Sequence, residues 1–116
     1  MNFHVDWNAA LASVNGDRSL LKLVIDAFLK ESVKLQDSIS AAITNQDAKL
    51  LHRTGHTLKG TMISLGAESW SHPARQLEDL GASGSVDGAQ PIAEELDQLL
   101  PSLREQLQSF SVEQSD

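Results

Sequence analysis

The sequence contains no cysteine, so disulfides and thiolate metal sites are excluded, and a reducing compartment is compatible with it. Its start lacks a basic segment followed by an apolar one, and no apolar run approaches the ~20 residues that cross a bilayer. We therefore expect a cytoplasmic protein that is not held in a membrane. A strand signal of alternating β-branched residues is also missing, so the sequence predicts an all-α fold.

Positive charge is scarce as well. Nine Lys and Arg stand against sixteen Asp and Glu, a net charge of −7, which repels nucleic acid and anionic membranes over most of the surface. With 116 residues, the chain is long enough for one domain that removes about two-thirds of its unfolded surface from water. We expect residues 1–116 to form this single domain, with 110–116 as a frayed tail.

Five segments carry apolar residues at the three-and-four spacing of amphipathic helices. The first is short, 5–14, with Asp6 as a candidate N-cap, and the second begins after a cap at Asp17 or Ser19. The third runs from about 48 to 65 behind Asp47. The inward face of the second, longest helix is predicted to contain Leu20, Val24, Ala27, Phe28, Leu35, Ile39 and Ala42.

Prolines interrupt the last two helices. Pro73 either lies in the first turn of a helix that begins near Ser71 or kinks a helix over 68–80. The small residues of 81–88 predict a loop. In the final helix, 89–109, Pro101 is expected to cause a kink or a break. The short connections favour an antiparallel four-helix bundle with the short N-terminal helix packed over one end.

One stretch of the third helix, 51–67, combines an apolar stripe with an outward histidine. At about 100° per residue, the apolar residues share one face with Gly55, and His56 points away from it. The stripe consists of Leu51, Leu58, Met62 and Leu65. Within roughly 60° of His56 on the helical wheel lie His52, Arg53, Lys59, Gly60 and Ile63.

The surroundings of His56 suit phosphoryl chemistry. An exposed imidazole has a pKa near ~6.5, so a neutral fraction with a nucleophilic nitrogen exists at pH 7. Lys59, one turn along, favours the neutral ring and can hold a phosphoryl group, which carries about −1.5 to −2 charge. Gly60 costs the helix ~1 kcal/mol relative to Ala. We interpret that cost as room for a partner to approach the ring.

These residues resemble the histidine-containing phosphotransfer (HPt) domains of bacterial and fungal phosphorelays. The resemblance lies in GHTLKG around His56, in the following LGA of 65–67, and in ARQLEDLG of 74–81. It implies a four-helix bundle whose histidine, His56, accepts a phosphoryl group from the aspartyl phosphate of a receiver domain and passes it to another receiver. By the same matching, Lys59 would contact the phosphoryl oxygens, Gly60 would leave access, and Glu78 would orient the ring.

The resemblance further implies a phosphoryl carrier rather than an enzyme. The receiver supplies the carboxylate and the Mg²⁺, and the chain itself carries no cofactor and no metal. Its expected partners are response-regulator receivers and a hybrid sensor histidine kinase, with no nucleic acid and no membrane, and the family is usually monomeric. His52, Arg53 and Ile63 would line the docking surface, although Ile63 is bulkier than the pattern leads one to expect.

Two other readings stay open from the sequence. His52 and His56 have the i, i+4 spacing of a zinc-binding pair, which would need a third ligand such as His72 or Glu68, and neighbouring cations oppose it. The bundle could instead be an adaptor or dimerisation module without phosphotransfer. A hydrolase is disfavoured, because no Ser, His and acid constellation and no Gly-rich phosphate loop can be found.

Overall fold

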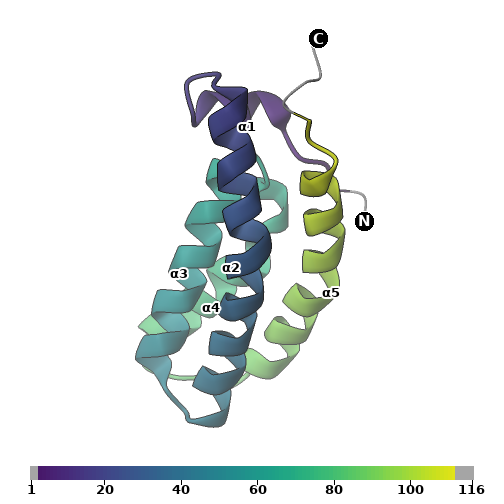
Figure 1. Cartoon of the computed structure of the whole chain (residues 1–116). Coiled ribbons are helices and arrows are strands. Elements are labelled where there is room, and N and C mark those ends of the chain that lie inside the picture. The colour runs from purple at the N-terminus through teal and green to yellow at the C-terminus, as the bar shows by residue number, and fades with distance from the viewer. Residues whose placement is uncertain (1–2, 112–116) are drawn as a thin grey trace.

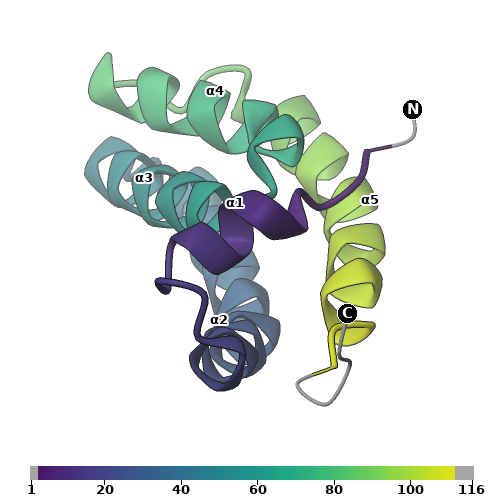
Figure 2. The same ribbon diagram turned by 90° about the horizontal axis from the view of Figure 1, so that it is seen from above.

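The computed structural model of the chain describes residues 3–111. Within them, four long helices lie side by side, and a short one crosses one end (Figures 1 and 2). The helices are α1 (Trp7–Ala12), α2 (Arg18–Thr44), α3 (Ala48–Ser64), α4 (His72–Ala82) and α5 (Ala89–Gln108), with a 3-10 turn, η1 (Glu68–Trp70), before α4. No strand occurs in this range, and the all-α bundle with an additional N-terminal helix is confirmed.

Aspartates begin the first three helices, as predicted. The side chain of Asp6 accepts a hydrogen bond from a backbone N–H three residues on at 3.1 Å, and those of Asp17 and Asp47 do the same at 3.0 Å. Each carboxylate satisfies a backbone donor that has no partner inside its helix. For α2, the cap is therefore Asp17 rather than Ser19.

The two prolines behave differently from each other. Pro73 lies in the first turn of α4, which confirms the prediction of a helix that begins near Ser71. Its missing N–H is harmless there, because first-turn donors have no intrahelical partner. Pro101 lies inside α5, which continues through it to Gln108, so the predicted break is wrong. The predicted loop also begins later than expected, because α4 extends through Ala82.

The predicted inward face of α2 is partly wrong. Leu20 is 43% exposed and Ala27 is exposed. The first half of α2 carries apolar residues on several sides, so the spacing rule fits two neighbouring stripes equally well. Contacts with the rest of the bundle select Leu21 and Ile25 in place of Leu20 and Val24, whereas the predicted Phe28, Ile39 and Ala42 are buried as expected.

The end of the bundle is closed by aromatic packing. Trp7 of α1 stacks on Phe110 with ring centroids 5.3 Å apart, and the guanidinium of Arg18 lies over the same phenyl ring. Phe110 is consequently buried, although the sequence placed it in a frayed tail. The remainder of that predicted tail, from residue 112, lies outside the described residues.

Candidate functional site

His56 lies in the middle of α3 with 66% of its side chain exposed. The opposite side of the helix carries the predicted apolar stripe, and all of its members are fully buried: Leu51, Leu58, Met62 and Leu65. This core contact fixes the rotation of α3 about its axis. The histidine is therefore held in solvent by the packing of the residues behind it.

Two glycines bring α3 and α4 unusually close together. A Cβ atom at Gly55 of α3 would lie 2.7 Å from the backbone nitrogen of Glu78 and 2.9 Å from the carbonyl oxygen of Ala74. A Cβ at Gly81 of α4 would collide with the backbone of His52 on α3. Since only glycine tolerates such an approach, the two helices touch backbone to backbone beside His56.

The close approach places Glu78 at the centre of the site. Its Oε2 lies 2.6 Å from Nδ1 of His56, and its Oε1 lies 2.6 Å from Nζ of Lys59. Its backbone carbonyl oxygen lies 3.1 Å from Nδ1 of His52. Only 11% of the Glu78 side chain is exposed. One residue of α4 thus contacts three polar side chains of α3.

The pKa of Glu78 is lowered from its ordinary value. The largest cause is the hydrogen bond from Lys59, and the hydrogen bond from His56 and the charges of both partners act in the same direction. Partial burial opposes them by disfavouring the charged form, but it does not prevail. Glu78 is therefore a carboxylate at neutral pH, and a carboxylate only accepts hydrogen bonds.

This carboxylate determines the tautomer of His56. Because Glu78 Oε2 can only accept, Nδ1 of His56 must carry the proton and donate it across the 2.6 Å contact. The other ring nitrogen, Nε2, then keeps its lone pair when the ring is neutral. The site holds an exposed imidazole with its nucleophilic nitrogen free and its second nitrogen bound to a negative charge.

Lys59 is less exposed than the sequence predicted. Its side chain is 21% exposed, and its ammonium is bound to Glu78 rather than free beside the ring. The helical wheel placed Lys59 among the outward neighbours of His56, but its ammonium reaches Glu78 on α4. Lys59 and His56 are thereby joined through the two oxygens of one carboxylate.

The other predicted site residues lie on the exposed side of α3. Gly60 has open space where a side chain would project, so nothing within residues 3–111 requires a glycine there. Ile63, predicted among the outward neighbours of His56, is 36% exposed. His52 and Arg53 are exposed as well. No group of three potential metal ligands among His, Asp and Glu comes together in residues 3–111, so His72 and Glu68 do not complete the zinc pair.

Sequence reasoning missed two features of the site. Gly81 was assigned to a loop, whereas it is the residue of α4 that admits the backbone of α3. The contact between His52 and the Glu78 carbonyl was also not foreseen. A signal for the first existed, because Gly55 lies on the inward stripe, where a glycine indicates a neighbour too close for a side chain.

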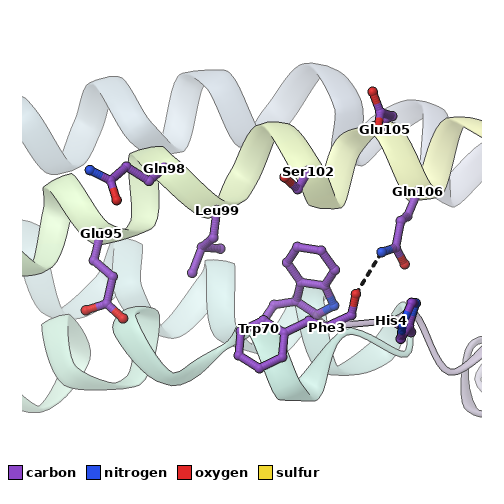
Figure 3. Close-up of a pocket in the computed structure, with 9 residues that line it drawn as sticks. All are labelled: Phe3, His4, Trp70, Glu95, Gln98, Leu99, Ser102, Glu105 and Gln106. Atoms are coloured by element: carbon purple, nitrogen blue, oxygen red, sulfur yellow. Dashed lines mark hydrogen bonds between the residues drawn. The ribbon is translucent and has the colours of Figure 1, made fainter. Parts of the chain in front are cut away.

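A separate groove lies between α5 and the N-terminal segment (Figure 3). The Trp70 and Phe3 rings pack at its base with centroids 5.5 Å apart. Gln106 holds the segment by donating to the Phe3 carbonyl and accepting from the Val5 N–H, both at 2.8 Å. None of the predicted site residues lines this groove, and its hydrogen bonds fasten the start of the chain to α5.

An antiparallel helical bundle with one solvated, carboxylate-bound histidine defines a class of protein that presents an imidazole to a partner. Comparison with known proteins identifies the family: the Hpt domain matches residues 23–106, and the chain belongs to this family. It is a histidine phosphotransfer protein of a phosphorelay, a phosphocarrier of the kind that interacts with receiver domains.

A solved structure agrees with this assignment at the level of the fold. Histidine-containing phosphotransfer protein B (HptB) from Pseudomonas aeruginosa PAO1 superposes with a TM-score of 0.81 and 22% sequence identity. The match covers 90% of this chain and 91% of that one. No curated protein matches the sequence. No helix in residues 3–111 is both long enough and apolar enough to pass through a membrane.

Proposed function

We propose that His56 is the phosphoacceptor, taking a phosphoryl group from the aspartyl phosphate of one receiver domain and delivering it to another. The observation that carries the proposal is the 2.6 Å contact between Glu78 Oε2 and Nδ1 of a histidine that is 66% exposed. It leaves Nε2 as the free, outward nucleophile. Among the other histidines within residues 3–111, only His52 also contacts Glu78.

The transfer step uses this arrangement directly. Nε2 of His56 attacks the phosphorus, an N–P bond forms, and the bond between phosphorus and the aspartyl oxygen breaks to release a carboxylate on the receiver. The imidazole gains positive charge as the N–P bond forms, while Nδ1 keeps its proton. The Glu78 carboxylate, already hydrogen-bonded to Nδ1, stabilises that charge without moving. Return of the phosphoryl group reverses each change.

The partner provides the remaining chemistry in this proposal. Mg²⁺ and the receiver's carboxylates neutralise the phosphoryl oxygens, so this chain needs no cofactor of its own. Lys59, whose ammonium contacts the same carboxylate as His56, is proposed to contact the phosphoryl oxygens once the group is on His56. The chain acts as a monomeric cytoplasmic carrier, and a hybrid sensor kinase with its own receiver is a second source of phosphate.

Docking of the receiver is proposed over the outward face of α3. Gly60 leaves open space one turn after His56, and Ile63 presents an apolar contact one turn further. Arg53 and His52 lie one turn before the acceptor and complete the polar edge of this face. An open, partly apolar surface beside the nucleophile suits a partner that must bring its own active site to the ring.

The test is incorporation of phosphate from a phosphorylated receiver into the wild type, His56→Gln and His72→Gln. We expect an acid-labile, base-stable label on the wild type and on His72→Gln, since His72 is an exposed histidine of α4 outside the site. His56→Gln should take up none. A label that persists in His56→Gln would remove the assignment and favour the adaptor reading. Unfolding curves of both variants check that the bundle is intact.

A further inference from the structure

His52 is held by the same residue that holds His56. Its Nδ1 lies 3.1 Å from the carbonyl oxygen of Glu78, and a carbonyl can only accept, so Nδ1 carries a proton. The ring is exposed and lies one turn before His56, with centroids 6.4 Å apart and planes within 25° of parallel. Glu78 therefore orients His52 with its main chain and His56 with its side chain.

The Nε2 atoms of both rings are left free by these contacts. A phosphoryl group on His56 Nε2 would bring about −1.5 to −2 charge and strong acceptor oxygens to the neighbourhood of His52. A neutral His52 has only a lone pair to present there, because its single proton is on Nδ1. Protonation of His52 at Nε2 adds an N–H donor and a positive charge without disturbing the bond to Glu78.

We propose that His52, protonated at Nε2, binds the phosphoryl group carried by His56, so that phosphorylation of this chain is coupled to uptake of a proton from water. The inference rests on the proposed function, because it needs the phosphoryl group on His56. No covalent bond other than the N–H bond at His52 changes in the coupled step. His52 is thus a second phosphoryl-binding residue.

Charged groups of both helices lie around His52. On α3, the cations Lys49 and Arg53 lie within one turn of it. On α4, the carboxylate of Glu78 already contacts Lys59 and His56. The other acidic residue there is Asp79, which follows Glu78 in the chain. A phosphoryl group on His56 adds a nearby anion, which stabilises the protonated form of His52.

The experiment uses the intact chain and phosphoramidate as a small-molecule phosphodonor, so that no receiver is required. Phosphorus NMR identifies the phosphohistidine, and nitrogen-15 NMR of the rings follows the titration of each histidine before and after phosphorylation. We expect the proton affinity of His52 to rise roughly twofold to fivefold, the range of an exposed charge contact. His72 serves as the internal control and should not change.

Two variants separate binding from a merely structural role. In His52→Ala, the phosphoryl group loses a cationic neighbour, so its own phosphorus-detected titration should move to higher pH. His52→Gln, a neutral donor of similar reach, should restore only part of that change. If His56 is phosphorylated but His52 responds no more than His72, the inference is overturned and the proposed function stands. Absence of phosphate on His56, or its appearance on His52 instead, overturns both.

Discussion

Replacing Glu78 by glutamine should weaken both the stability and the reactivity of the site. Glutamine keeps the size of the side chain but has one acceptor oxygen where the carboxylate has two. In the structure both oxygens are used, one by Lys59 and one by His56, each at 2.6 Å. The amide nitrogen of the new side chain would therefore face an N–H donor, which leaves one of the two donors without a partner.

The magnitude follows from the exposure of the two partners. The contact with Lys59 is largely shielded, with side chains 21% and 11% exposed, and its loss costs about 1 kcal/mol. Loss of the contact with His56 costs less, about 0.5 kcal/mol, because that ring is 66% exposed and water screens the interaction. We expect Glu78→Gln to lower the free energy of unfolding by about 1–2 kcal/mol, and to slow phosphorylation of His56 about tenfold through loss of the charge behind Nδ1.

Urea unfolding and the rate of phosphate uptake from a receiver measure the two effects, with Asp79→Asn as the control for charge. Because the pKa of Glu78 is lowered on folding, its contribution is fully present above the unfolded pKa and is lost as pH falls through the folded one. The difference between wild type and Glu78→Gln should accordingly shrink in acid. A variant that matches Asp79→Asn in both assays at pH 7 would refute the reasoning.

Four further substitutions test neighbouring features. Lys59→Ala should slow transfer more than about tenfold and cost no more than about 1 kcal/mol in urea unfolding, and a stability loss without a rate loss would contradict its phosphoryl role. Gly60→Gln should raise the free energy of unfolding by about 0.5–1 kcal/mol yet prevent phosphotransfer from a receiver, and an unchanged transfer rate would exclude the access argument. Gly55→Ala, by contrast, should lower the free energy of unfolding by more than about 1 kcal/mol. Pro101→Ala should raise the melting temperature, since Pro101 is an exposed residue inside a continuous helix, and no rise would contradict the cost assigned to this proline.

Local signals in the sequence were sufficient for most of the helices. Asp6 and Asp47 could be named as caps, and Asp17 as one of two candidates, because capping depends on the side chain and the three residues that follow it. The stripe behind His56 was equally clear, since Leu51, Leu58, Met62 and Leu65 recur at helical spacing on one face of α3. The inward face of α2 was not, because Leu20 and Leu21 both fit the spacing and the sequence holds no information on the neighbouring helix.

The candidate site, too, has features that the sequence predicts and features that it does not. The exposure of His56 and the room at Gly60 follow from the periodicity of α3 alone, and the structure agrees with both. The ion pair between Lys59 and Glu78 could not be predicted in this way, since Glu78 lies on a different helix, α4. Which side chains of two helices meet depends on how closely the helix axes approach, and a helical wheel of one segment gives no information on that distance.

The close approach of α3 and α4 is the physical variable on which the proposed reactivity of His56 depends. A histidine on an isolated α3 would have the same neighbours in sequence but no acceptor for Nδ1–H, so either ring nitrogen could carry the proton. Gly55 and Gly81 remove the side chains that would otherwise separate the helices, and Glu78 then reaches Nδ1. A methyl group at either glycine would push α4 away from α3 and lengthen the hydrogen bond between His56 Nδ1 and Glu78, whose strength falls with distance. Either ring nitrogen of His56 could then carry the proton. The proposed phosphoryl acceptance at Nε2 therefore depends on the helix pair, and substitutions at these two buried glycines should impair it although neither touches the phosphoryl group.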